Sequence, residues 1–241
     1  MMRRPLAATT LVLVLTACSS GPRAPDWQVN AHGAAERAVQ AELRGPARVA
    51  EAEWRRAVAE VASTAQPARL ARMELLRCAV QQAALDGKAC DEHARRWPTT
   101  DASDAAYRRY LAAQPQAADV ELLPPAHRPL ARWLLALPGT AFDPTSATGA
   151  ASAAASNAPP SSLLGVVEDP LSRLVAASVL VRAGDRSSAT LNVAIDTASA
   201  QGWRQPLHAW LLLALQQARV AGDATAQQLW EARLRALSGQ P

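Results

Sequence analysis

The sequence is poor in residues that favour β-sheets. Phenylalanine occurs once and tyrosine twice in 241 residues, and aromatic residues make up only 4% of the chain. Alanine and leucine, which favour helices, are abundant. Because 49% of the residues are hydrophobic, the chain can still bury a substantial core. This composition argues against an all-β fold and predicts an all-α protein.

Clustered basic charge is also missing. The formal net charge is only +4, and Lys88 is the single lysine. Proteins that bind nucleic acids need a concentrated cationic surface to neutralise phosphates. We therefore expect no nucleic-acid partner.

No catalytic or metal-binding motif stands out. The histidines His32, His93, His127 and His208 are scattered, and we expect each at a helix cap or on the surface. Cys90 and His93 have the spacing of metal ligands, but two ligands are too few for a usual zinc site. The chain also lacks a phosphate-binding loop and a nucleophile elbow. We expect a protein without enzymatic activity and identify no metal, cofactor or small-molecule substrate.

The first 17 residues have the order of a secretory signal peptide. Arg3 and Arg4 form a cationic start, the apolar run 11–15 follows, and small residues precede Cys18. The apolar run is too short for a helix that crosses a bilayer, which needs about 20 residues. We expect residues 1–17 to be removed on export.

The segment Leu15-Thr16-Ala17-Cys18 resembles the lipobox of bacterial lipoproteins. The resemblance implies that Cys18 is lipidated, with palmitate-type acyl chains, and becomes the first residue of the mature chain. Ser19 after the cysteine implies sorting to the outer membrane of a Gram-negative bacterium, facing the periplasm, with residues 18–25 as a tether. The alternative is an ordinary signal peptide with a chance cysteine at the cleavage site.

Helical patterns follow throughout residues 26–137 and 163–239, and they are clearest after Asp169. Asp169 and Pro170 predict a helix start, and Gly184 predicts its end. The run 210–215 is apolar on nearly all sides, so we expect its helix to be the buried one. The start and turn signals recur: Ala183-Gly184-Asp185 returns as Ala221-Gly222-Asp223, and Pro170-Leu171 returns as Pro206-Leu207.

Gly45, Ala50, Trp54 and Ala57 have the spacing of a tetratricopeptide repeat (TPR), in which a glycine at a turn precedes small, large and small residues. The chain thus resembles a degenerate TPR-like α-solenoid of helix hairpins. The resemblance implies a curved array whose concave surface binds peptides or partner proteins. An irregular helical bundle is the alternative.

Residues 138–162 interrupt the helical pattern. They are rich in alanine, serine and proline and carry one charge, which predicts a flexible linker. This segment either divides the chain into two helical lobes, 26–137 and 163–239, or projects from one continuous array.

Two groups of residues are candidates for specific roles. Cys78 and Cys90 remain after lipidation, and an exported chain meets an oxidising compartment, so we expect a structural disulfide. Arginine and aromatic residues dominate binding energy in protein interfaces, which makes a second group a candidate for partner binding. Its members are Arg95, Arg96, Trp97, Tyr107, Arg108 and Arg109.

The sequence therefore predicts a membrane-anchored lipoprotein that acts as an interaction scaffold or assembly factor for envelope proteins. An enzyme acting on peptidoglycan, or an activator of cell-wall synthesis, is the alternative. A structural component that self-associates through an end repeat is a third hypothesis.

Overall fold

The computed structural model describes residues 23–86, 90, 100–137 and 159–239, and every regular element in these ranges is helical. This confirms the all-α fold. The helices, in chain order, are α1 (Asp26–Arg44), α2 (Ala47–Ala62), α3 (Pro67–Ala83), α5 (Ala102–Leu111), the 3-10 turns η1 (Ala117–Leu122) and η2 (Pro125–His127), α6 (Arg128–Leu135), α8 (Ser162–Gly165), α9 (Pro170–Arg182), α10 (Ser188–Ala200), α11 (Arg204–Ala221) and α12 (Ala224–Ser238). The signal segment, Cys18 and residues 138–158 of the predicted linker lie outside the described residues.

Local signals set the helix ends as the sequence predicts. The Asp169 carboxylate accepts a hydrogen bond of 2.7 Å from the Ser172 backbone N–H at the start of α9, directly before Pro170. Gly45, which follows α1, has φ of 114°, and Gly222, which follows α11, has φ of 69°. Residues with a side chain rarely adopt this left-handed backbone conformation, whereas glycine does so without steric strain. Glycine is therefore suited to end both helices.

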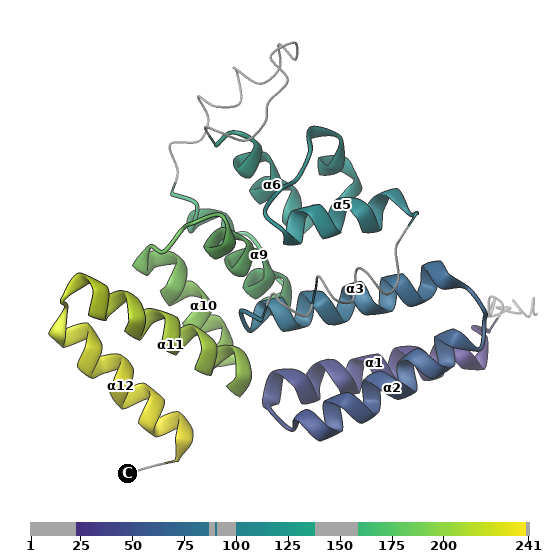
Figure 1. Cartoon of the computed structure of the whole chain (residues 1–241), viewed down its shortest axis with the longest axis horizontal. Helices are drawn as coiled ribbons and strands as arrows, with labels where there is room; N and C mark the ends of the chain where they lie inside the picture. Colours follow the sequence, from purple (N-terminus) through teal and green to yellow (C-terminus); the bar gives the residue numbers. More distant parts are fainter. Residues whose placement is uncertain (1–22, 87–89, 91–99, 138–158, 240–241) are drawn as a thin grey trace, which may run out of the picture.

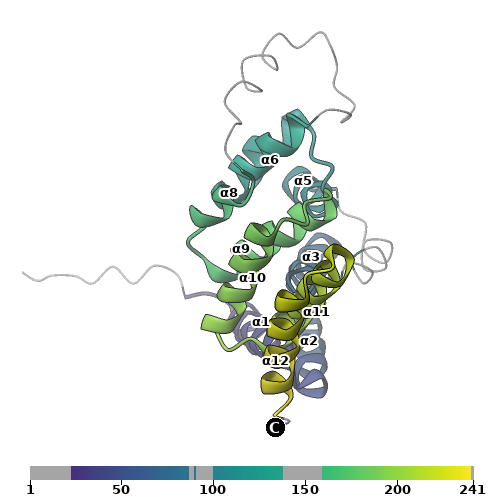
Figure 2. The same ribbon diagram turned by 90° about the vertical axis from the view of Figure 1, so that its left-hand side faces the viewer.

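The array is built from helices that pack against their neighbours in the chain. The pairs α1–α2, α9–α10 and α11–α12 are antiparallel hairpins with short turns (Figure 1). The positions that carry the repeat pattern, Ala50, Trp54 and Ala57, are all buried between α1 and α2. Figure 2 places α6 and α8 at one end of the molecule and α12 towards the other.

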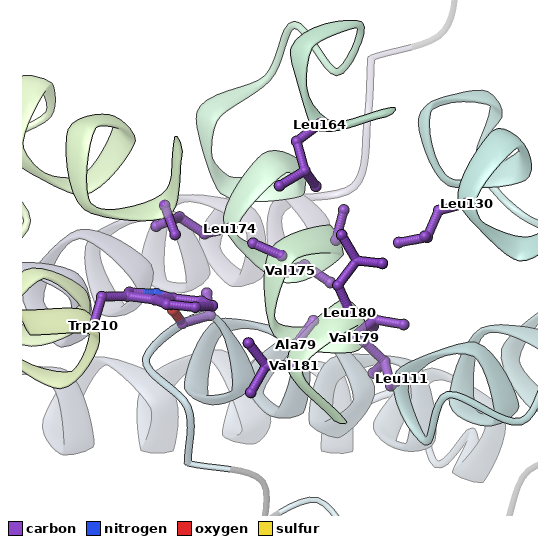
Figure 3. Close-up of a cluster of buried hydrophobic side chains, with 14 of the residues drawn as sticks. Ala79, Leu111, Leu130, Leu164, Leu174, Val175, Val179, Leu180, Val181 and Trp210 are labelled. Carbon is purple, nitrogen blue, oxygen red and sulfur yellow. The ribbon is translucent and has the colours of Figure 1, made fainter. Parts of the chain in front are cut away.

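Helix α9 occupies the centre of the core. All eight residues from Leu174 to Val181 are buried, and they contact α3, α5, α8 and α10 (Figure 3). The expectation that the apolar run 210–215 marks the buried helix is only partly correct. Trp210 is fully buried, but Leu212 in the same run is 46% exposed. Helix α9 is central instead, because helices that precede residues 138–158 and helices that follow them both cover it.

One hydrophobic cluster joins the helices before and after residues 138–158. It includes Leu75 and Leu111 from the first part and Leu174 and Trp210 from the second. The array also curves back on itself, because the last hairpin reaches the first: α11 contacts α1 as well as α10 and α12 (Figure 1). This contact creates the groove described below.

Candidate interaction groove

The two cysteines in the described residues form a disulfide. Cys78 on α3 and Cys90 are joined by a disulfide, with their Cα atoms 4.8 Å apart. Cys78 is 3% exposed and belongs to the hydrophobic core, and Cys90 packs against the same core. The disulfide therefore joins Cys90 to the core through α3, which is the role of a structural disulfide.

Tyr107 belongs to a buried aromatic cluster. Its ring centroid lies 5.5 Å from that of His127 and 6.0 Å from that of Tyr110. The Tyr110 hydroxyl lies 3.0 Å from His127 Nδ1, and His127 is only 2% exposed. His127 occupies the N-cap position of α6, as one of the two expectations has it, but its side chain makes no capping hydrogen bond. The other expectation, a surface location, is wrong for His127. The sequence gives no sign that His127 is buried, because its burial depends on the packing of η2 against α9 and α6.

Burial sets the protonation of this cluster. It lowers the pKa of His127 to about 4, against a smaller opposing effect of the Asp169 charge. Burial also raises the pKa of the Tyr107 and Tyr110 hydroxyls. At neutral pH all three side chains are uncharged, which suits a packed polar cluster in the core.

Arg109 is engaged within the protein. Its Nε donates a hydrogen bond of 2.8 Å to Asp119 Oδ2, and its Nη2 donates to the other carboxylate oxygen. Asp119 is 1% exposed and also accepts a 2.8 Å hydrogen bond from the Gln116 backbone N–H. The Arg109 hydrogen bonds are the main cause that lowers the pKa of Asp119. This bidentate pair holds η1 on α5.

The structure describes three of the six predicted partner-binding residues, and these three do not share one open surface. Tyr107 faces the core cluster and Arg109 is paired with Asp119, whereas Arg108 is partly exposed on α5. Arg95, Arg96 and Trp97 lie outside the described residues. Two hollows in the described surface lie elsewhere, between the first and the last hairpin.

The larger hollow has a volume of about 810 Å³ and lies where the turn between α1 and α2 meets α11 and α12. Its lining residues are Arg44, Gly45, Arg204, Gln205, His208, Leu212, Leu234, Leu237 and Ser238. Three leucines and two arginines thus combine apolar surface with positive charge.

The smaller hollow, of about 330 Å³, continues from the larger one towards α2 and α3. Its lining residues are Glu42, Gly45, Ala47, Ala50, Glu51, Trp54, Arg77, Gln81, Ala84, Asp86, Gln205, His208 and Ala209. Gly45, Gln205 and His208 line both hollows, so the two adjoin. We call the two hollows together the hairpin groove.

Polar side chains in the wall of the smaller hollow bind one another. Trp54 is 1% exposed, and its indole N–H donates to Glu42 Oε2. Arg77 Nη2 donates a hydrogen bond of 2.6 Å to Glu51, and the Arg77 guanidinium carbon lies 5.8 Å from the Trp54 ring centroid. The indole and both carboxylates are thus held in place before any partner arrives.

Two polar atoms of this wall have no hydrogen-bond partner among the described residues. They are Arg77 Nε, a donor, and Gln81 Oε1, an acceptor, one turn apart on α3. A buried polar atom that the protein leaves unpaired raises the free energy of the folded state by about 1–3 kcal/mol. Both atoms can accept a partner from outside the protein, such as a water molecule or a polar group of a ligand.

Other kinds of site are not apparent in the described part of the chain. Within it, no cluster of three or more histidine, cysteine, aspartate or glutamate side chains could hold a metal ion. In the same residues, no helix combines the length and apolar character needed to span a membrane.

Comparisons with known proteins add no relative. No protein-family model, no curated protein and no solved structure matches the chain.

Sequence reasoning found only part of this groove. The repeat pattern singles out Gly45 and Trp54, which both line it. It gives no sign of Arg204, Gln205 or His208, because these residues follow Gly45 by about 160 positions and meet it only through the packing of α11 on α1.

Proposed function

We propose that this protein is a lipid-anchored scaffold or assembly factor of the bacterial cell envelope, which binds a partner protein in the hairpin groove. The observation that carries the proposal is the groove itself: charged and apolar side chains from the first and last hairpins line two adjoining hollows. Arginine is enriched among the residues that dominate binding energy in protein interfaces. The leucines of the larger hollow add apolar surface that a partner would remove from water.

The anchor belongs to the same proposal. The lipobox-like segment Leu15-Thr16-Ala17-Cys18 supports attachment through Cys18 to the outer membrane, facing the periplasm. Several acyl chains make such an anchor stable, since each buried methylene contributes about 0.8 kcal/mol. The Ser-, Gly- and Pro-containing segment 19–25 separates the anchor from α1, which begins at Asp26.

Site-specific photo-crosslinking in cells tests the groove. A photoreactive amino acid at Gln205, which is exposed and lines both hollows, is expected to yield a discrete crosslinked envelope protein. The matched control is Val166, which is 68% exposed and lines neither hollow. The proposal fails if Gln205 gives no adduct, or if Val166 gives the same adduct with equal yield.

The anchor has its own test. Cys18→Ala is expected to abolish labelling by radioactive palmitate and to move the protein from the membrane fraction to the soluble fraction. Unchanged labelling or fractionation would show that Cys18 is not the anchor. The crosslink at Gln205 is expected to weaken in this variant, because tethering raises the local concentration of a membrane partner.

The proposed role does not include catalysis. Incubation of the purified protein with isolated peptidoglycan is therefore expected to release no soluble fragments above a heat-treated control. Release of fragments would favour the alternative of an enzyme that acts on the cell wall.

A further inference from the structure

The two ends of the hairpin groove carry opposite charge. Arg44 and Arg204 line the larger hollow, and no carboxylate lines it with them. Arg44 forms no ion pair with another described residue, and Arg204 donates a hydrogen bond of 2.9 Å to the Leu237 carbonyl oxygen. Both positive charges are thus uncompensated by acidic groups of the described chain.

The smaller hollow has the reverse balance. Glu42, Glu51 and Asp86 line it together with a single cation, Arg77. Arg77 is paired with Glu51 at 2.6 Å, so the charges of Glu42 and Asp86 have no cationic partner among the described residues. This end of the groove is therefore acidic.

The leucines of the groove lie at the cationic end. Leu234 and Leu237 of α12 face the larger hollow together with Leu212 of α11, which is 46% exposed. An apolar side chain placed over Leu212 would remove apolar surface from water, which favours binding. A ligand of this end should thus combine a negative charge with an apolar group.

Gly45 and Gln205 lie at the boundary between the two hollows and line both. A Cβ atom at Gly45 would lie 3.7 Å from Gln205 Nε2, which is an ordinary van der Waals contact, but Gly45 adopts a φ of 114°. A residue with a side chain would therefore strain this turn. A ligand that reaches both hollows must cross the surface formed by Gly45 and Gln205.

We propose that the hairpin groove binds a polypeptide segment in which an acidic and apolar stretch is separated from a basic stretch. The acidic and apolar stretch lies against Arg44, Arg204 and Leu212, and the basic stretch lies against Glu42 and Asp86. A nucleic acid or an anionic lipid surface carries one sign of charge, so the acidic end would repel it. This inference rests on the proposed function and specifies the chemistry of the partner at the same groove.

Fluorescence anisotropy with the full-length protein in mild detergent tests the proposal. The probe is a labelled synthetic peptide with glutamate and leucine in one half and lysine in the other. The control peptide has the same composition with the charges alternating. We expect the segregated peptide to bind about tenfold more tightly, and this preference to shrink at high salt.

Charge reversal in the protein gives a test that does not depend on stability. Arg44→Glu/Arg204→Glu changes two exposed side chains and is expected to weaken binding of the segregated peptide by about tenfold or more. A peptide in which lysine replaces the glutamates should bind this variant better than the original protein. The Asp86→Lys variant should likewise bind a peptide whose lysines are replaced by glutamates more tightly than the original protein does.

The matched control is Arg182→Glu/Arg186→Glu, which reverses two exposed arginines that line neither hollow. This variant should bind the segregated peptide as the original protein does. Equal affinity of the original protein for the segregated and alternating peptides would overturn the proposal. So would a charge-reversed variant that does not bind the lysine-substituted peptide better than the original protein does. Arg44- and Arg204-dependent binding to phosphatidylglycerol vesicles, without binding of any peptide, would overturn it in favour of a lipid headgroup. A crosslink at Gln205 despite such results would leave the scaffold role standing and remove only the charge pattern.

Discussion

The indole N–H of Trp210 donates a hydrogen bond of 2.9 Å to the carbonyl oxygen of Ala83, 127 residues earlier in the chain. Both groups are buried, and Ala83 is the last residue of α3. Carbonyls at the end of a helix have no partner within the helix, so this one depends on α11. The bond joins the helices before the predicted linker to those after it.

Trp210→Phe should therefore destabilise the whole protein. The phenylalanine retains most of the apolar contact but leaves the Ala83 carbonyl unpaired, at an expected cost of about 1–3 kcal/mol. Urea unfolding followed by circular dichroism measures this loss. Trp230→Phe is the control, because Trp230 on α12 is only partly buried. Equal effects of the two substitutions would show that the bond to Ala83 contributes little.

Arg109→Ala should be more damaging than Arg108→Ala. The first substitution leaves the buried Asp119 carboxylate without its bidentate partner, which should lower the free energy of unfolding by about 2–3 kcal/mol. The second removes a partly exposed arginine and should change that value by less than about 0.5 kcal/mol. Thermal and urea unfolding of the two variants, in parallel, distinguish a structural role of Arg109 from a role in partner binding. A loss of partner binding in Arg109→Ala at unchanged stability would contradict this assignment.

Stability should fall as the pH drops from about 6.5 to about 4. Burial lowers the folded-state pKa of His127 to about 4, whereas an unfolded histidine has a pKa of about 6.5. Protons therefore bind the unfolded state first, and stability decreases with pH across this interval by up to about 3 kcal/mol. Below about pH 4 the contribution of His127 becomes constant. The lowered pKa of Asp119 adds a further loss in acid, as that carboxylate becomes protonated.

His127→Gln separates the two contributions, since it removes the titrating imidazole and retains Asp119. Urea unfolding at several pH values should show a flatter profile between pH 6.5 and 4 for this variant, even if its stability at neutral pH is lower. A profile parallel to that of the original protein would exclude His127 as the source.

Reduction of the Cys78–Cys90 disulfide should destabilise the fold without abolishing it. The bridge closes a short loop, for which the chain-entropy model gives about 2–3 kcal/mol. The urea midpoint should move to lower concentration when dithiothreitol is added. The double variant Cys78→Ala/Cys90→Ala should have a low midpoint that no longer responds to dithiothreitol. An unchanged midpoint on full reduction would mean that core packing alone holds Cys78 and the segment after α3.

Several features of the fold could be read directly from residues. Asp169 and Pro170 start α9, Gly222 ends α11, and the buried positions of Ala50 and Trp54 follow their spacing. These predictions succeeded because caps, turns and helical periodicity depend on neighbours within a few positions. Prediction of the central helix was less accurate, since burial on all sides requires helices from distant parts of the chain. The exposed Leu212 shows that an apolar run alone does not establish this.

The features of the candidate site likewise fall into those that follow from the sequence and those that depend on tertiary packing. The sequence by itself determined the helices, the hairpin turns and the residue types available for binding. Only the tertiary structure decided that Arg109 turns inward to Asp119, that His127 is buried beside Tyr110, and that α11 meets α1. The physical reason is that capping and periodicity act locally, whereas the groove exists only once a shared core brings Gly45 and Gln205 together across about 160 residues.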